Sequence, residues 1–189
     1  MNFCSHCGSP RLEHRIPDGD TLPRFVCANC DTIHYQNPKV VVGCLPEWDG
    51  KVLLCKRAIE PRYGLWTLPA GFLENGETLT AGALRETLEE AHARVVIDDL
   101  YTVISLPQIN QVYMMFRSRL LDLDFGPGEE SLEVTLFEER DVPWESLAFR
   151  TIARTLRNWF LDRRSLAFPL HVSSLSRRSP PPPDLLAAA

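Results

Sequence analysis

Two pairs of cysteines near the N-terminus constrain the fold more than any other feature of this sequence. Cys4 and Cys7 form one C-x-x-C pair, and Cys27 and Cys30 form a second pair after an interval of 19 residues. A gap of two residues lets both thiolates of one turn reach the same tetrahedral ion, and the longer interval brings the second turn opposite the first. The pattern therefore predicts a zinc site with four cysteine ligands.

The segment around these cysteines, residues 1–38, is rich in Cys, Pro, Gly, Asp and Asn and holds few long apolar side chains. Because it cannot build a hydrophobic core, a structural zinc ion would supply its folding free energy. Two disulfides or free thiols are the alternative, which a reducing compartment disfavours. Four cysteines complete a zinc site, so we expect His6, His14 and His34 to be surface residues.

Charge and hydropathy exclude several classes of partner. The net charge is −5, with 20 basic and 25 acidic residues, which argues against a general nucleic-acid or anionic-membrane surface. Residues 1–38 hold three basic and four acidic residues, so the cysteine segment is not a phosphate-binding surface either. No apolar run approaches the roughly 20 residues of a membrane span, and the N-terminus lacks the pattern of a signal peptide. We therefore expect a cytoplasmic protein.

From residue 39 the sequence changes character and predicts a mixed-sheet α/β or α+β domain over residues 39–170. The runs KVVVGCLPEW and KVLLCKR are typical of two strands joined by a turn at Trp48, Asp49 and Gly50. Cys44 and Cys55 fall in these strands and are expected to be small core residues.

Further strands and two helices are predicted downstream. The strands lie near residues 95–105, 111–121 and 132–137, and the helices start after a Thr78 cap and over residues 147–164. Residues 171–189 include the run SRRSPPPPDLLAAA. We expect this tail to be disordered or to lie loosely on the surface.

The stretch GFLENGETLTAGALRETLEEAH, residues 71–92, crowds acidic residues onto one helix face. On a helical wheel Glu86, Glu89 and Glu90 point the same way, with Gly82 and Ala83 leaving space beside them. The opposite stripe is expected to pack on the sheet and consists of Ala81, Leu84, Leu88 and Ala91.

Crowded carboxylates repel one another unless a partner offsets their charge. Three of them with open space favour a hard divalent cation, Mg²⁺ or Mn²⁺, although a solvated acidic helix face is the alternative. Glu77 lies before the helix, where its carboxylate is expected to meet Arg85.

The spacing of these residues matches the signature of the Nudix hydrolases, which this chain resembles. The matching positions are Gly71, Glu77, Arg85, Glu86, Glu89 and Glu90. The resemblance implies that Glu86, Glu89 and Glu90 are Mg²⁺ or Mn²⁺ ligands, and that Arg85 with Glu77 forms a supporting ion pair. It also implies a further glutamate from the run GPGEESLEV, where Glu130 and Glu133 are chosen over Glu129 as base or extra ligand.

Up to about residue 170 the chain is similar to Nudix enzymes that carry an N-terminal zinc ribbon. This resemblance implies a mixed-sheet α/β/α sandwich preceded by a small zinc ribbon, and a homodimer. It implies hydrolysis of FAD or ADP-ribose, which releases AMP. The runner-up is an NADH pyrophosphatase that removes NAD caps from RNA; the chain has YTVISLPQINQVYMMF where that group carries Ser-Gln-Pro-Trp-Pro-Phe-Pro. A non-catalytic ligand sensor is the third alternative.

Two residues depart from the family signature. His92 stands at a position where glycine often caps the helix in a left-handed conformation, and Thr87 stands where an aliphatic residue is usual. Neither departure removes a metal ligand.

Five residues are candidates for substrate contacts. Arg57 and Arg62 are expected to meet phosphates, and the aromatic rings of Tyr63, Trp66 and Tyr113 are expected to stack on a base or isoalloxazine ring. A core or surface position is the alternative for each, and Trp66 in particular can pack beneath its loop.

Overall fold

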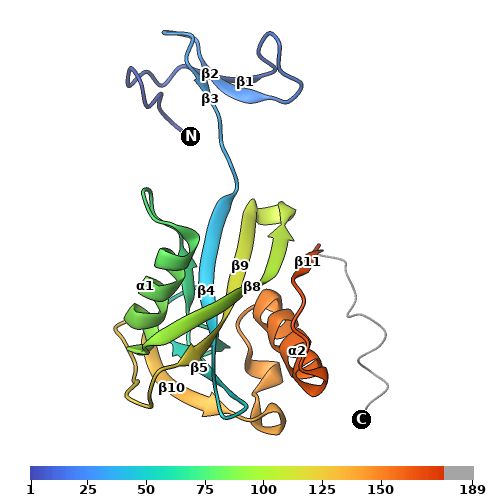
Figure 1. Ribbon diagram of the computed structural model, residues 1–189. Helices are drawn as coiled ribbons and strands as arrows, with labels where there is room; N and C mark the ends of the chain where they lie inside the picture. The colour runs from blue at the N-terminus through green and yellow to red at the C-terminus, as the bar shows by residue number, and fades with distance from the viewer. Residues whose placement is uncertain (177–189) are drawn as a thin grey trace. The chain divides into compact units, whose positions relative to one another are not determined.

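The structure, a computed structural model, describes residues 1–176 of the chain. The chain forms two compact units, Met1–Pro38 and the part from Lys39 onward. Figure 1 follows the chain from blue at the N-terminus to red near the C-terminus.

The first unit is a three-stranded antiparallel sheet with two cysteine-bearing turns. Its strands, in the order β1-β2-β3, are β1 (Leu12–Arg15), β2 (Arg24–Cys27) and β3 (Ile33–His34). Its buried side chains are Cys4, Pro17, Val26, Cys27 and His34. So small a core cannot offset the conformational entropy of the ordered chain, and the unit therefore needs a cross-link such as a bound ion.

The second unit is built around one mixed sheet. Its strands are β4 (Lys39–Trp48), β5 (Lys51–Arg57), β6 (Trp66–Thr67), β7 (Ala70–Phe72), β8 (Val95–Leu106), β9 (Gln111–Leu120), β10 (Ser131–Phe137) and β11 (His171–Ser174). The order is β10-β5-β4-β9-β8-β11, with β6 beside β5 and β7 beside β4. Strand β4 runs parallel to β9 and β11 parallel to β8, whereas the other pairs are antiparallel. The predicted mixed sheet is confirmed.

Strand β4 lies near the middle of the sheet because it is apolar on both faces. Its residues 41–46 are all buried, which is typical of a strand covered on both sides. Asp49 and Gly50, both with positive φ, turn the chain from β4 into the antiparallel β5. The predicted hairpin is therefore confirmed, and Cys44 and Cys55 are buried in it as expected.

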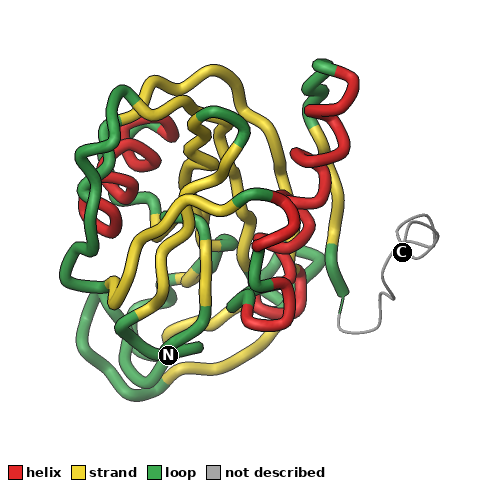
Figure 2. The backbone as a smooth tube through the Cα atoms, turned by 90° about the horizontal axis from the view of Figure 1, so that it is seen from below, coloured by secondary structure: helices red, strands yellow, loops and turns green. Residues whose placement is uncertain are grey.

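Helices α1 (Leu79–Ala91) and α2 (Arg150–Ser165) cover opposite faces of this sheet (Figures 1 and 2). On the α1 side, Ala83 packs with Val42 and Cys44. The core on the α2 side contains Leu45, Met115, Ile152, Leu156 and Trp159. Successive residues of a strand point to opposite faces, so Cys44 and Leu45 serve different cores. The result is the α/β/α sandwich that the resemblance implied.

Short 3-10 helices complete the unit: η1 (Pro107–Ile109), η2 (Glu139–Asp141) and η3 (Trp144–Ser146). Helix α2 starts at Arg150, three residues after the predicted Leu147, because Phe149 is extended and Leu147 forms a backbone bridge with Trp66. Tertiary pairing there overrides the helical spacing of the apolar residues.

The predicted tail boundary at His171 is wrong for the first residues of that segment. Strand β11 pairs in parallel with β8, from His171 opposite Thr102 to Ser174 opposite Ser105. Leu175 follows in a core position and is 3% exposed. A strand of four residues in which only Val172 is apolar carries little signal in sequence, since the partner strand is far away along the chain. The rest of the predicted tail, residues 177–189, lies outside the described residues.

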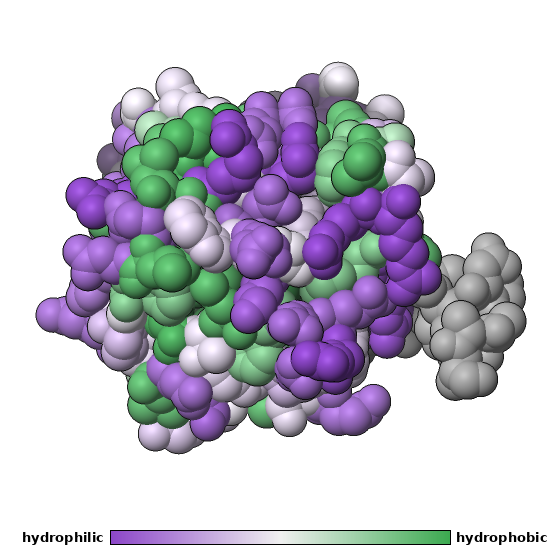
Figure 3. Space-filling model, turned by 60° about the horizontal axis from the view of Figure 1, so that its bottom comes forward, coloured by the Kyte–Doolittle hydropathy of each residue, from purple (hydrophilic) through white to green (hydrophobic). Residues whose placement is uncertain are grey.

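No helix among residues 1–176 is long and apolar enough to cross a membrane. On the face shown in Figure 3, hydrophobic residues form small groups separated by hydrophilic ones. Scattered apolar residues of this kind are normal where a protein surface meets water.

Candidate functional site

Helix α1 begins after Thr78, as the sequence predicts. The Thr78 hydroxyl caps its N-terminus by accepting a hydrogen bond from the Ala81 amide at 3.1 Å. His92 ends the helix with φ 48° and ψ 21°, and its amide donates to the Leu88 carbonyl at 2.9 Å. A histidine therefore takes the left-handed position that glycine commonly fills.

The face of α1 that packs on the sheet differs from the predicted one. Leu84 and Leu88 are 40% and 51% exposed, so their expected place in the packing stripe is wrong, as is that of the exposed Ala81. The buried residues of the helix are Gly82, Ala83, Thr87, Glu90 and Ala91. The predicted face was chosen on the helical wheel by the polarity of the residues. Close packing of the helix on β4 instead requires short side chains on the buried face.

Short side chains let α1 approach β4 closely. The Cys44 thiol lies 3.5 Å from the Ala83 carbonyl oxygen. Thr87 is fully buried, and its hydroxyl donates to the same carbonyl at 2.7 Å, which satisfies the polar group that departs from the family pattern. Glu90 lies one turn further on this face, so the packing turns one signature carboxylate towards the sheet instead of away from it.

Glu90 is the most buried of the three helix glutamates. It is 6% exposed, and its carboxylate accepts a hydrogen bond from the Ala70 amide of β7 at 3.0 Å. Burial raises the pKa of Glu90 to about 8, and the charges of Glu86 and Glu130 act in the same direction. A bound cation would relieve this cost, since it favours the ionised carboxylate.

Arg85 organises the acidic residues around it. Its guanidinium lies 2.7 Å from Glu77, 2.8 Å from Glu86 and 3.0 Å from Glu89, and it also donates to the Phe72 carbonyl at 3.2 Å. The predicted Arg85–Glu77 ion pair is present, and hydrogen bonds from Arg85 lower the pKa of Glu77. The contacts to Glu86 and Glu89 were not predicted from the sequence.

The carboxylates of Glu86, Glu89 and Glu90 offer oxygen ligands, which hard divalent cations prefer. Burial raises the pKa of Glu86, and Glu89 in turn adds repulsion. A Cβ at Gly71 would clash with the Glu86 carboxylate, so glycine leaves room for this group against β7. Among the described residues, the carboxylate oxygens are not gathered as closely as the cysteine sulfurs of the first unit. Instead, Arg85 binds both Glu86 and Glu89.

The loop before β10 adds one of the two predicted glutamates to this site. Glu130 lines the same pocket, as does its neighbour Glu129. Glu133 does not: it lies on β10, 51% exposed in its side chain, and pairs with Lys56 at 3.7 Å. Strand β10 begins at Ser131, so Glu133 belongs to the strand and not to the loop that carries Glu130.

Two glycines of this loop form hydrogen bonds to the end of α1. The Gly126 amide donates to the Ala91 carbonyl at 2.9 Å, and the Gly128 amide donates to the Glu90 carbonyl at 3.1 Å. A Cβ at Gly128 would clash with the Glu89 carbonyl, so a glycine is needed for this approach. The loop thus satisfies carbonyls that the helix end leaves free.

A pocket of about 1170 Å³ lies in front of the carboxylates. Arg57, Arg62 and Tyr113 line it, as expected of substrate-contact candidates. Tyr63 and Trp66 do not line it. Tyr63 is 58% exposed, and Trp66 packs in the core edge-to-face on Phe137 with ring centroids 4.9 Å apart. For Trp66 the alternative of a core position is the one found.

The pocket also has walls that the sequence did not indicate. Phe149, Arg150 and Thr151, at the start of α2, line it, and Leu175 reaches it from the segment after β11. A threonine in the first turn of an amphipathic helix is a weak signal that could have drawn attention to α2. Nothing in the sequence marked Leu175, because its place depends on the pairing of β11.

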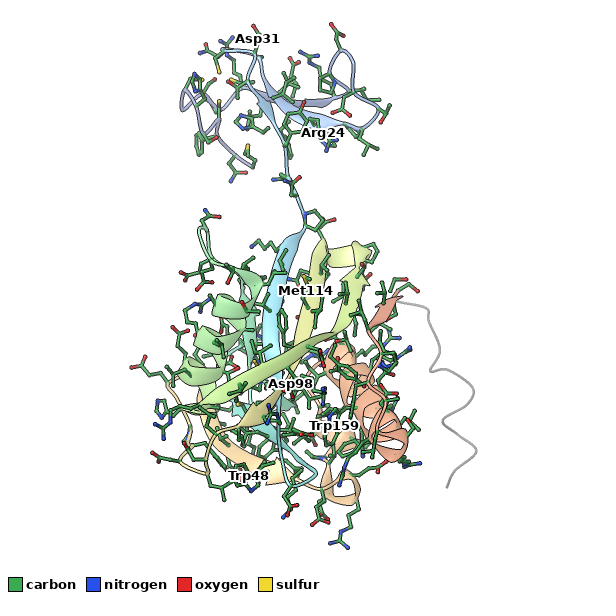
Figure 4. The ribbon with its side chains drawn as sticks, in the orientation of Figure 1. Arg24, Asp31, Trp48, Asp98, Met114 and Trp159 are labelled. Carbon is green, nitrogen blue, oxygen red and sulfur yellow. The ribbon has the colours of Figure 1, made fainter. Side chains whose placement is uncertain are left out.

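The four cysteines of the first unit form a compact cluster. Their sulfurs all lie within 4.8 Å of one another, with Cys4–Cys30 and Cys7–Cys27 pairs at 3.7 Å. A tetrahedron with bonds of about 2.3 Å has sulfur–sulfur edges of about 3.8 Å, so the cluster fits one zinc ion. Figure 4 labels Arg24 and Asp31, which precede and follow the second cysteine turn in the sequence.

The histidines of this unit are not ligands of the cluster as found. His6 and His14 are exposed as expected, but His34 is 8% exposed, so the prediction of a surface position is wrong for it. His34 pairs with Phe25 in the sheet, and its Nδ1 lies 3.5 Å from the Ser5 hydroxyl. Strand pairing buries it in a unit that has few apolar residues to place inside.

Comparisons with known protein families match both units. Residues 2–36 match the family model of the zinc-ribbon type described as Nudix N-terminal, and residues 37–160 match the model described as NUDIX domain. The two matches meet between residues 36 and 37, close to the division between the units after Pro38.

Individual relatives point the same way. The chain is 28% identical over 129 residues to an ADP-ribose pyrophosphatase of Methanocaldococcus jannaschii, which covers 66% of this chain and 76% of that protein. It is 29% identical over 147 residues to an NAD-capped RNA hydrolase, NudC, of an Enterobacter strain, which covers 75% of this chain and 53% of that protein. The chain thus spans only about half the length of this second relative.

One solved structure is similar to this chain over most of its length. The crystal structure of a NUDIX hydrolase from Nitrosomonas europaea is 60% identical, with a TM-score of 0.90, and covers 94% of this chain and 100% of that one.

Proposed function

Because the chain belongs to the Nudix hydrolase family, we propose that it hydrolyses the pyrophosphate bond of a nucleoside diphosphate linked to a second moiety. The favoured substrates are ADP-ribose and FAD, and AMP is one product of each. The observation that carries this proposal is the placement of Glu86, Glu89, Glu90 and Glu130 along one pocket with Arg57 and Arg62. Acidic metal ligands and basic phosphate ligands in one pocket suit a pyrophosphate. A volume of about 1170 Å³ suits a dinucleotide-sized substrate.

Mg²⁺ or Mn²⁺ is proposed as the cation, held by Glu86, Glu89 and Glu90. Bound there, the cation would neutralise charge on phosphoryl oxygens and acidify water. Arg85 positions two of these glutamates through its ion pairs, and the Ala70 amide positions Glu90.

Each remaining role falls to a residue of the pocket. Glu130 is proposed as the general base that takes a proton from the attacking water. The water oxygen forms a bond to one phosphorus while the bond from that phosphorus to the bridging oxygen breaks. With ADP-ribose the products are AMP and ribose 5-phosphate. Arg57 and Arg62 are proposed to bind the phosphates, and Tyr113 to contact a ring of the substrate.

NADH or the NAD cap of an RNA is the second candidate substrate, because relatives named NAD-capped RNA hydrolase match this chain. The ADP-ribose proposal is favoured because the M. jannaschii relative is covered over more of its length. The homodimer and the cytoplasmic location expected from the sequence remain predictions.

The test is incubation of zinc-loaded protein and Mg²⁺ or Mn²⁺ with ADP-ribose, FAD, NADH and NAD-capped RNA, followed by separation of the products. The E130Q variant is expected to lose most of the activity. E133Q is the matched control, since Glu133 lies outside the pocket, and it is expected to act like wild type.

Each outcome has a clear meaning. No turnover of any substrate would contradict the enzymatic proposal and favour a ligand sensor. A preference for NADH or capped RNA would reverse the substrate order. Equal loss in E130Q and E133Q would remove Glu130 from the role of base.

A further inference from the structure

The start of helix α2 forms part of the pocket wall, and two of its backbone amides and one hydroxyl have no hydrogen-bond partner within residues 1–176. Phe149, Arg150, Thr151 and Ile152 all line the pocket. Phe149 stands at the N-cap position and offers no side-chain acceptor, so the helix has no cap bond. The amides of Thr151 and Ile152 donate to no acceptor within residues 1–176. Free amides and the helix dipole together favour an anion at such an end.

The Thr151 hydroxyl is a second and independent sign of a ligand. Thr151 is 1% exposed, and its Oγ1 has no hydrogen-bond partner in the described part of the chain. Other buried threonines of this unit are satisfied: Thr87 bonds to the Ala83 carbonyl, and Thr155 bonds to Thr102 at 3.0 Å. A buried hydroxyl without a partner destabilises the fold, so its persistence at a pocket wall suggests that a ligand supplies the partner.

Arg57 places a fixed positive charge beside this helix end. Its guanidinium carbon lies 5.3 Å from the centre of the Phe149 ring, and its Nε donates to the Pro61 carbonyl at 2.9 Å. The two other guanidinium nitrogens have no hydrogen-bond partner among residues 1–176, while the residue as a whole is 9% exposed. The side chain is therefore held in place, with two donors left for a ligand in the pocket.

We propose that the first turn of α2, the Thr151 hydroxyl and Arg57 form a phosphoryl subsite in the pocket that the carboxylates also line. The proposal rests on the proposed function, because the subsite would hold the phosphate that AMP retains after hydrolysis. Amides at a helix end, a hydroxyl donor and an arginine are the groups that bind phosphate oxygens without a cation. The glutamates repel phosphate when no divalent cation is present. Phosphate binding without Mg²⁺ or Mn²⁺ therefore does not pass through the carboxylates, and its dependence on the Thr151 hydroxyl reports on the α2 end.

The experiment measures binding to zinc-loaded, full-length protein without added Mg²⁺ or Mn²⁺, by calorimetry. The ligands are AMP, inorganic phosphate and adenosine, which lacks the phosphate. We expect T151V to weaken AMP binding about tenfold, since it removes one hydrogen bond to a charged group. T151S keeps the hydroxyl and is expected to bind AMP within about threefold of wild type. T155V is the matched control, because Thr155 is buried on the same helix outside the pocket lining.

The three ligands distinguish the source of the phosphate. Binding of AMP that is tighter than that of inorganic phosphate, with adenosine unaffected by T151V, supports a subsite for the nucleotide phosphate. Equal binding of AMP and inorganic phosphate supports the subsite as one that free phosphate also fills. Thermal unfolding of each variant shows whether the fold is kept.

The subsite and the proposed function can fail separately. If T151V and wild type bind AMP equally well, the subsite is wrong, whatever substrates the protein hydrolyses. If AMP binding depends on the Thr151 hydroxyl but no substrate is turned over, the subsite stands and the enzymatic proposal fails.

Discussion

Replacement of Glu90 by glutamine keeps the size of the side chain and an acceptor for the Ala70 amide, but it removes a buried charge. Burial raises the pKa of Glu90 in the folded protein from 4.5 to about 8. The stability that this group contributes is therefore fully present below pH 4.5 and is lost as the pH rises through 8. At 1.36 kcal/mol per pKa unit, the loss above pH 8 is about 5 kcal/mol. Without Mg²⁺ or Mn²⁺, E90Q is thus expected to be more stable than wild type at pH 8.5.

The assay is urea unfolding of zinc-loaded protein between pH 5 and 8.5 in buffer without added Mg²⁺ or Mn²⁺. The difference between E90Q and wild type is expected to shrink as the pH falls. E89Q is the matched control: its carboxylate comes from the same helix but is 59% exposed, so its effect is expected to stay within about 0.5 kcal/mol at each pH.

A second measurement connects this stability to the proposed cation. Added Mg²⁺ at pH 8 is expected to stabilise wild type by mass action and to stabilise E90Q much less. If E90Q follows the wild-type curve at every pH, the burial of a charged Glu90 has no cost and the reasoning is refuted.

Three other perturbations have defined outcomes. G71A places a Cβ against the Glu86 carboxylate and is expected to lower Mg²⁺-dependent activity at least tenfold, whereas G126A, which has open space around its Cβ, is expected to lower it much less; equal activities would contradict the role of Gly71. Truncation after residue 170 removes β11 and the pocket residue Leu175, so it is expected to lower the thermal midpoint and raise KM, while truncation after residue 176 keeps both; indistinguishable variants would show that β11 is dispensable. A thiol-specific mercurial is expected to release about one zinc ion per chain, measured with a chromogenic chelator, because four cysteines form one cluster; a value near zero in reduced protein would remove the zinc assignment.

Local signals predicted the parts of the molecule that depend on neighbours in sequence. The Thr78 cap and the turn at Asp49 and Gly50 each follow from the conformational preferences of one or two residues. The cysteine cluster was predictable from two C-x-x-C turns, and the Arg85–Glu77 pair from the place of Glu77 just before helix α1.

The features that the sequence did not predict depend on contacts between distant segments. Leu84 and Leu88 are as apolar as core residues, but the close approach of α1 to β4 leaves them outside. Nothing in the sequence favoured Glu130 over Glu133, because only the register of β10 places Glu133 beside Lys56. The parallel pairing of β11, and with it the place of Leu175, joins segments about 70 residues apart and leaves no periodic trace.

The attachment of the loop to α1 has a consequence for how the acidic site opens. Gly126 and Gly128 donate to the last carbonyls of the helix, and the same loop carries Glu130. Fraying of the final helical turn would therefore release Glu130 and the Glu90 backbone together. The two amides are then expected to exchange with deuterium at the rate of that turn, as one cooperative unit. If α1 were placed in another protein without this loop, its last carbonyls would lose their hydrogen bonds and the site would lack Glu130.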